Sequence, residues 1–193
     1  MDYKKNVCNM KIFVTGHTSG IGLATFNLLK ENNYDVIGGS RSTGFDISNS
    51  EQYKLIYDCD IFVNNAFHKT GQLDILRSVY DAWQHLPKKI INVGTANKDN
   101  QKNRPYSRLE YNVCKKSLET YSYWISENNS ICYSMMYNPG FVKTPLSIEG
   151  LKGWPDIEVD RILSQAMDVD ECAKTILFMI ESKHKLKEIT HTY

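Results

Sequence analysis

Short runs of apolar residues recur along the chain and alternate with stretches in which apolar positions repeat every three or four residues. The apolar runs read as buried strands and cover residues 11–14, 35–39, 60–66, 90–95 and 131–137. The clearest helical stretches between them are 71–86 and 107–128. This alternation predicts an α/β fold, a Rossmann-like, doubly wound parallel β-sheet flanked by helices, with ligands at the carboxyl ends of the strands. At 193 residues the chain is expected to form a single domain, residues 1–193.

Two connections add detail to this pattern. Few residues separate the second strand from Phe45-Asp46-Ile47-Ser48, so the crossover helix there is expected to be reduced to a turn or replaced by a bare loop. Residues 50–57 can then form a short helix. Further on, Asp168 and Glu171 predict a helix start, with the aspartate as N-cap and the glutamate at the third helical position.

Composition limits the partners. Hydrophobic residues make up 41% of the chain and charged residues 23%, as in an ordinary globular protein. A formal net charge of +1 gives no reason to expect nucleic acid or an acidic membrane as partner. No apolar run approaches a membrane span and no signal-peptide core is present, so a cytoplasmic protein is expected. The five scattered cysteines fit a reducing compartment, and the histidines lack metal-ligand spacing, so no metal site is expected.

A glycine-rich turn follows the first strand and precedes a helical pattern. Glycines permit a tight turn and let the phosphates of a dinucleotide approach backbone N–H groups at the start of a helix. The turn is interpreted as a dinucleotide-binding loop, and a mere connecting turn is the alternative. The residues of this loop expected at the cofactor are Gly16, Thr18, Ser19, Gly20, Ile21 and Gly22.

The second strand ends in Ser40-Arg41, without an acidic residue. In dinucleotide folds an acid at this place binds the ribose 2′-hydroxyl, whereas an arginine accommodates a 2′-phosphate. NADP(H) is therefore the expected cofactor, with NAD(H) as the alternative. If Arg41 is an ordinary surface arginine, this preference has no basis.

Tyr111 and Lys115 are four residues apart in a helical stretch and therefore share one face of the helix. A nearby ammonium favours the phenolate, so it lowers the pKa of the tyrosine from about 10. Such a tyrosine can exchange a proton with a substrate alcohol or carbonyl near neutral pH. A surface tyrosine beside a surface lysine is the alternative, and it is the better one if the pair is taken alone.

Five motifs, at 15–22, 64–66, 92–95, 111–115 and 139–144, occur in one order across almost the whole chain. In this order they resemble the short-chain dehydrogenase/reductase family, compact members in particular. The resemblance implies hydride transfer between a nicotinamide and a small carbonyl or alcohol substrate. Tyr111 is then the general acid or base, Lys115 also holds the nicotinamide ribose, and Thr95 binds the substrate oxygen. Further cofactor contacts implied by the resemblance are Asp46 near the adenine, Asn64, Asn65 and Ala66 on the adenine-ribose side, and Pro139, Gly140, Val142 and Thr144 at the nicotinamide.

The chain departs from the family pattern in three places. Phe67 replaces a glycine, which could narrow the cofactor cleft, and Thr95 replaces a serine. The helix 71–86 lacks the asparagine that orients the lysine in the family, and Asp74 is the nearest residue to that position. These departures lend weight to an alternative function, a catalytically weak or inactive NADP(H)-binding sensor or interaction protein. An epimerase or dehydratase using the same tyrosine and lysine is a further alternative.

Two more expectations follow from the resemblance. Residues 146–167 occupy the place of the substrate loop, and their apolar residues suggest a lid over the pocket. Relatives commonly pair through the helices 71–86 and 107–128, so a homodimer or homotetramer is an expectation. Four aromatic residues there belong either to such a contact or to the core: Tyr80, Trp83, Tyr123 and Trp124.

Overall fold

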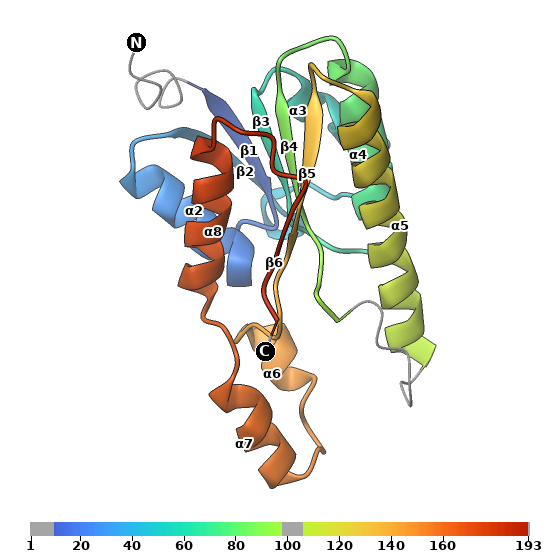
Figure 1. The fold of residues 1–193 in the computed structure, drawn as a ribbon. Helices are drawn as coiled ribbons and strands as arrows, with labels where there is room; N and C mark the ends of the chain where they lie inside the picture. Colours follow the sequence, from blue (N-terminus) through green and yellow to red (C-terminus); the bar gives the residue numbers. More distant parts are fainter. Residues whose placement is uncertain (1–9, 98–105, 193) are drawn as a thin grey trace.

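A computed structural model describes residues 10–97 and 106–192. Its centre is a six-stranded sheet in the order β2-β1-β3-β4-β5-β6, and every neighbouring pair of strands is parallel (Figure 1). The strands are β1 (Lys11–Thr15), β2 (Asp35–Gly39), β3 (Ile61–Asn64), β4 (Lys89–Val93), β5 (Tyr133–Asn138) and β6 (Glu188–Thr190). The first five confirm the predicted strands, whereas β6 was not predicted.

The direction in which the chain adds strands reverses at β1. From β1 the chain adds β2 on one side, and β3, β4, β5 and β6 follow on the other. Such a reversal leaves a crevice at the carboxyl ends of the two strands beside it, here β1 and β3. Both candidate loops, the glycine turn after β1 and the asparagines at the end of β3, therefore lie at this crevice.

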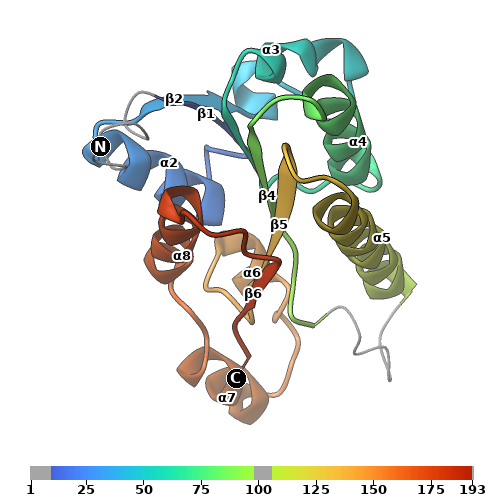
Figure 2. The ribbon, with the colours of Figure 1, turned by 45° about the horizontal axis from the view of Figure 1, so that its top comes forward.

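Helices cover both faces of the sheet (Figures 1 and 2). Helices α2 (Gly20–Glu31) and α8 (Val169–Glu181) lie side by side on one face. The other face carries α4 (Gly71–Trp83), α5 (Tyr106–Asn128) and the short α3 (Lys54–Tyr57). Two further helices, α6 (Pro145–Glu149) and α7 (Asp156–Ser164), form a lobe beyond the carboxyl ends of the strands.

The core has two parts, one on each face of the sheet. Alternate residues of each strand point to opposite faces, so Ile12 and Val14 of β1 pack toward α2 and α8, while Phe13 packs toward α4. Strands buried on both faces need apolar residues at nearly every position. The continuous apolar runs in the sequence are the consequence.

The shorter connections follow the predictions. After β2 the crossover helix is reduced to one 3₁₀ turn, η1 (Arg41–Thr43), and residues 50–57 form a second 3₁₀ turn, η2 (Ser50–Gln52), followed by α3. At the start of α8 the backbone N–H of Asp168 donates to Glu171 Oε2 at 2.9 Å, which confirms the predicted helix start.

The aromatic residues on α4 and α5 divide between core and surface. Trp83 is fully buried and Tyr80 is 7% exposed, and both belong to the core between the sheet and these helices. Trp124 is 49% exposed and stacks on the ring of Tyr121. Trp83 and Tyr80 are therefore core residues, and Trp124 is a surface residue.

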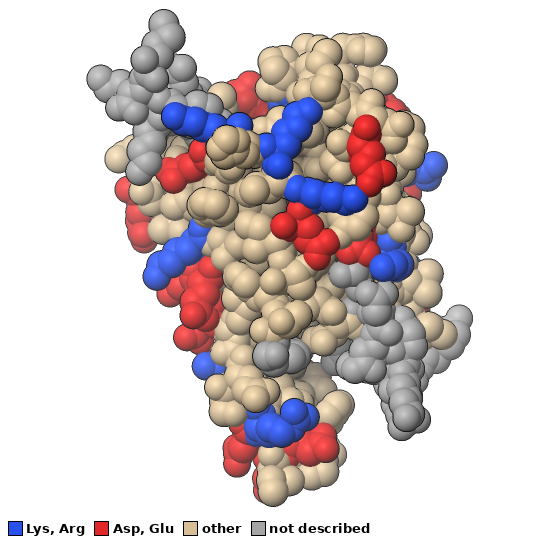
Figure 3. Space-filling model, in the orientation of Figure 1, with Lys and Arg blue, Asp and Glu red and all other residues tan. Residues whose placement is uncertain are grey.

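The visible surface carries both signs of charge. Lysines and arginines are interspersed with aspartates and glutamates over the face shown in Figure 3. Among the described residues, no helix combines the length and the apolar character needed to cross a membrane. The same part of the chain contains no cluster of three or more histidine, cysteine, aspartate or glutamate side chains arranged for a metal ion.

Candidate active site

The turn between β1 and α2 has a backbone that glycine adopts most readily. Gly16 and Gly20 have φ angles of +72° and +52°. At Gly22 an added Cβ would lie 2.2 Å from the carbonyl oxygen of Gly16, so any side chain would force the helix away from the loop. Ser19 makes no side-chain cap hydrogen bond, and no acidic residue lies in the first turn of α2. The start of the helix is therefore suited to an anion.

Thr15 ties this loop to the end of β3. Its Oγ1 accepts the backbone N–H groups of Asn65 at 2.9 Å and Ala66 at 3.0 Å, and its carbonyl accepts Asn65 Nδ2 at 3.0 Å. Without the hydroxyl, two partly buried backbone donors would lose their acceptor. The structure thus brings the predicted residues Asn65 and Ala66 against the glycine loop.

Hydroxyl groups cluster at the end of β2 beside Arg41. Ser40 Oγ lies 3.0 Å from Ser42 Oγ and 3.2 Å from Thr43 Oγ1, and Ser42 Oγ donates to Thr18 Oγ1 at 3.3 Å. The side chain of Arg41, in the same turn, is exposed. The structure therefore brings three of the predicted cofactor residues together, Thr18, Ser40 and Arg41.

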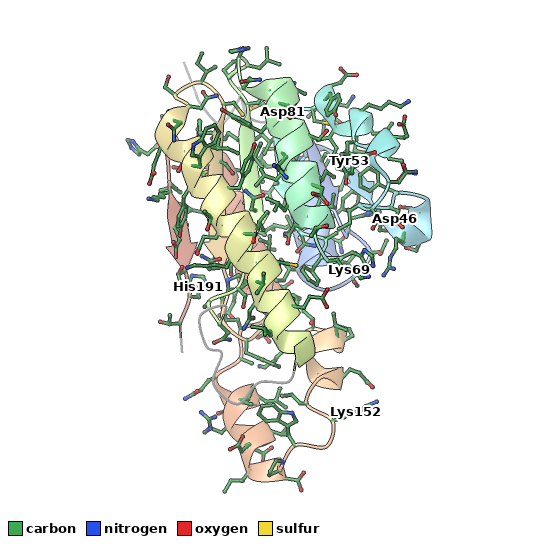
Figure 4. The ribbon with its side chains drawn as sticks, turned by 90° about the vertical axis from the view of Figure 1, so that its right-hand side faces the viewer. Asp46, Tyr53, Lys69, Asp81, Lys152 and His191 are labelled. Atoms are coloured by element: carbon green, nitrogen blue, oxygen red, sulfur yellow. The ribbon has the colours of Figure 1, made fainter. Side chains whose placement is uncertain are left out.

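Asp46 lies in the connection between β2 and α3, away from the lobe that carries Lys152 (Figure 4). Its Oδ1 accepts the backbone N–H of Ser48 at 2.9 Å. This hydrogen bond holds the pKa of Asp46 below its usual value, against an opposing effect of burial, and Arg41 and His68 act in the same direction as the hydrogen bond. Asp46 is therefore an ionised acceptor on the β2 side of the crevice.

Tyr111 and Lys115 share the face of α5 that is turned toward the sheet. Lys115 is 3% exposed, and its Nζ donates to the carbonyl of Val93 at 2.7 Å and to Gln72 Oε1 at 2.8 Å. The same Nζ lies 5.6 Å from the centroid of the half-buried Tyr111 ring. The alternative of two surface residues is therefore wrong for the lysine.

Burial has a strong effect on the charge of Lys115. It lowers the pKa of the ammonium from 10.5 to about 7, and only Cys114 acts in the opposite direction. Both hydrogen-bond acceptors are neutral, and none of the ion pairs among the described residues includes Lys115. A buried lysine without a carboxylate partner is costly, and such groups concentrate at functional sites.

The residue of α4 that contacts Lys115 is Gln72, and not Asp74. Its Nε2 donates to the carbonyls of Asn64 at 2.7 Å and Val93 at 3.0 Å, so its amide oxygen faces Lys115. Asp74 is exposed. The sequence did contain a signal for this contact, because Gln72 is a polar residue on the same helix face as the apolar Ile75. The structure buries both residues.

The side chain of Asn64 makes hydrogen bonds within the protein core. It is fully buried, and its Nδ2 donates to the carbonyl of Gln72 and to Asn92 Oδ1, both at 2.9 Å. Asn92 in turn donates to Ser134 Oγ at 2.7 Å, and Ser134 Oγ lies 2.8 Å from Ser122 Oγ on α5. This polar network fixes α4 and α5 against the sheet, and with them Gln72.

The loops after β4 and β5 meet at the same edge. Thr95 is 8% exposed, and its Oγ1 accepts the backbone N–H of Asn97 at 3.3 Å. The N–H of the intervening Ala96 donates to the carbonyl of Pro139 at 2.9 Å. The backbone that follows Thr95 therefore lies next to the loop that contains the predicted residues Pro139 and Gly140.

Thr144, at the end of this loop, lies close to the start of α2. It is the N-cap of α6, where its Oγ1 accepts the N–H of Ser147 at 3.1 Å. A Cβ added to Gly20 would lie 3.1 Å from Thr144 Cγ2. Val142, two residues earlier, is 6% exposed and pairs with Met167. The glycine loop and the Pro139–Thr144 segment thus face each other across the carboxyl edge of the sheet.

The predicted lid, 146–167, contains the rest of α6 and all of α7. Of its apolar residues only Leu151 is buried, at 7% exposed, while Leu146 and Ile157 are 84% and 81% exposed. Ile148 and Trp154 are exposed by about half. The segment therefore presents exposed apolar side chains, as a substrate lid would, and its role as a lid stays a prediction.

Known proteins resemble this chain in structure, whereas comparisons of sequence find no match. No model of a protein family matches the chain, and no curated protein matches its sequence. A 3-oxoacyl-(acyl-carrier-protein) reductase from Agrobacterium tumefaciens with NADP bound superposes with a TM-score of 0.77 at 15% identity, over 98% of this chain and 96% of that one. A 3-alpha-hydroxysteroid dehydrogenase from a Pseudomonas species, complexed with NADH, gives 0.73 at 17% identity over 93% and 94%.

A third structure, from Brucella melitensis, is described as a short-chain dehydrogenase/reductase and gives a TM-score of 0.75 at 16% identity, over 93% of each chain. This chain has the short-chain dehydrogenase/reductase fold. The resemblance carried by the five motifs is thereby confirmed for the fold.

Proposed function

We propose that this protein is a member of the short-chain dehydrogenase/reductase family and an NADP(H)-dependent oxidoreductase. Its substrate is a small carbonyl or alcohol compound, and its proton donor and acceptor is Tyr111. The observation that carries the proposal is Lys115, buried at the carboxyl edge of a parallel sheet, held by two neutral acceptors and placed beneath Tyr111. A fold that needed only stability would gain by replacing such a lysine with an apolar residue.

The residues at the crevice fit a dinucleotide. Gly16, Gly20 and Gly22 leave a backbone cradle that a side chain would fill, at a helix start without competing acids. The hydroxyl cluster with the exposed Arg41 offers donors for a 2′-phosphate, which supports NADP(H) over NAD(H). When bound, the nicotinamide supplies or accepts the hydride.

The chain's own residues then handle the proton. Tyr111 donates a proton to the substrate oxygen during reduction and removes it during oxidation. Lys115, when charged, lowers the pKa of Tyr111, and the phenolate in turn raises the pKa of Lys115, so the pair exchanges protons near neutral pH. Thr95 donates its hydroxyl hydrogen to the same substrate oxygen and stabilises the charge that develops there. Gln72 and the carbonyl of Val93 fix the position of the lysine.

The proposal is tested by Tyr111→Phe, with Tyr121→Phe on the same helix as the matched control. NADPH binding is measured by titration, and NADPH oxidation is measured with a panel of aldehydes and ketones. We expect all three proteins to bind NADPH, and Tyr111→Phe alone to lose turnover by roughly 10²–10⁴-fold. Full activity of Tyr111→Phe would refute the role of the tyrosine. NADPH binding by the wild type without turnover would favour the alternative, a sensor or interaction protein on this scaffold.

A further inference from the structure

Phe67 touches both residues of the proposed proton-transfer pair. It follows β3 directly after Asn64, Asn65 and Ala66, at the place where the motif resemblance leads one to expect glycine. Its ring lies 4.7 Å from the ring of Tyr111, centroid to centroid, at an interplanar angle of 68°. Lys115 Nζ lies 5.3 Å from the centroid of the Phe67 ring. One side chain from the β3 end therefore contacts two successive turns of α5.

The backbone that precedes this ring is hydrogen-bonded to the glycine loop. The N–H groups of Asn65 and Ala66 both donate to Thr15 Oγ1, and Asn65 Nδ2 donates to the carbonyl of Thr15. Phe67 is the next residue along. Although its side chain is 39% exposed, Phe67 follows directly on a hydrogen-bonded segment at the end of β3.

The surroundings of Lys115 contain little else that favours a positive charge. Its acceptors on α4 and β4 are the neutral Gln72 Oε1 and the carbonyl of Val93. The titratable groups near it on α5 are Tyr111 and Cys114. Glu110 of α5 and Asp74 of α4 act on Cys114. Glu119, one turn further along α5, is buried and forms an ion pair with Lys116. A cation close to an aromatic face is stabilised by the ring, and more so where water is excluded. The rings of Phe67 and Tyr111 both offer such a face.

We infer that Phe67 is a positioning residue for this site, whose ring stabilises the ammonium of Lys115 from one side while its contact with Tyr111 holds the phenol in place. A glycine at this position would provide neither contact. Burial alone lowers the pKa of Lys115 to about 7, so any stabilisation of the ammonium changes how much of it is charged at neutral pH. The inference deepens the proposed function and rests on it for its catalytic meaning.

The test compares Phe67→Leu, which keeps apolar volume without an aromatic face, with Phe67→Tyr, which keeps the face. The pKa of Lys115 is measured by NMR on protein with isotope-labelled lysine, and Lys115→Met assigns the signal. We expect Phe67→Leu to lower the pKa of Lys115 by about one unit and Phe67→Tyr to leave it near the wild-type value. An unchanged or raised pKa in Phe67→Leu would overturn the inference.

A third variant separates the ring's effect from that of water. Phe67→Gly opens the lysine to solvent, so the desolvation of Lys115 is relieved and its pKa is expected to rise, opposite in sign to the leucine variant. A fall in Phe67→Gly as large as that in Phe67→Leu would still support the effect of the ring on the ammonium, and would show that the ring does not shield Lys115 from water.

The measurement does not depend on turnover, so the two proposals fail separately. If the pKa of Lys115 shifts as expected but no variant, nor the wild type, oxidises NADPH, the positioning role stands and the proposed function falls. If the wild type is active and Phe67→Leu changes neither the pKa of Lys115 nor the pH profile of turnover, the positioning role falls and the proposed function stands.

Discussion

Replacing Lys115 with methionine is expected to make the protein more stable at neutral pH while removing its proposed activity. Methionine has nearly the same length and no charge, so it fills the same space among Gln72, Val93 and Phe67. The wild-type lysine has to remain in a site where burial brings its pKa from 10.5 down to about 7. Keeping Lys115 charged in the folded protein at low pH therefore destabilises the fold by at most roughly 5 kcal/mol.

Part of the stability gained by Lys115→Met is offset by a lost hydrogen bond. Gln72 Oε1 loses the donor that bonds it at 2.8 Å, which costs about 1–3 kcal/mol, whereas the Val93 carbonyl keeps its bond from Gln72 Nε2. The net expectation is a stabilisation of roughly 1–4 kcal/mol. Between pH 7 and 10.5 the unfolded chain binds the Lys115 proton and the folded chain does not, so wild-type stability rises with pH in this window. The advantage of Lys115→Met should therefore be complete below pH 7 and shrink above it.

Urea unfolding of both proteins at a series of pH values tests this expectation. Lys174→Met serves as the control, because Lys174 is an exposed lysine on α8. The control should differ little from the wild type at any pH. The reasoning would be refuted by a Lys115→Met protein less stable than the wild type below pH 7, or by an advantage that does not change with pH.

Three further predictions concern the rest of the crevice. Arg41→Ala should weaken NADPH binding about tenfold or more, roughly 1.4 kcal/mol, and leave NADH binding unchanged in calorimetric titrations; equal losses for both would show that Arg41 does not read the 2′-phosphate. Thr95→Ala should lower turnover by about 10²-fold and Thr95→Ser should retain it, and unchanged kinetics in the alanine variant would remove Thr95 from the mechanism. Gly22→Ala should destabilise the fold by roughly 1–3 kcal/mol and abolish NADPH binding, because its Cβ would lie 2.2 Å from the Gly16 carbonyl oxygen; a stable variant that binds NADPH would contradict this geometry.

The sequence predicted the fold well because the central strands are buried on both faces. Residues such as Ile12, Phe13 and Val14 form continuous apolar runs that are hard to mistake. Strand β6 escaped prediction because it is an edge strand of three residues, of which only Ile189 is apolar. Its pairing with β5 depends on where the chain returns after α8, which no local pattern encodes.

The candidate site was predictable where its residues are neighbours in sequence. The shared face of Tyr111 and Lys115 follows from helical spacing alone. The partners of Lys115 do not, because Gln72 and Val93 reach it from α4 and β4 through the packing of three elements. The sequence showed Phe67 as a departure that could narrow the cleft, but its contact with both members of the pair became visible only in three dimensions.

The central claim is that Lys115 prepares the phenol of Tyr111 for proton transfer at the crevice. Its most direct test is the pH titration of phenolate absorbance, taken as the difference between wild type and Tyr111→Phe in the presence of NADP⁺. The account predicts one phenol in the wild type that ionises well below the usual tyrosine pKa of about 10 and is missing from the variant. A difference spectrum in which that phenol titrates at or above the usual value would contradict it.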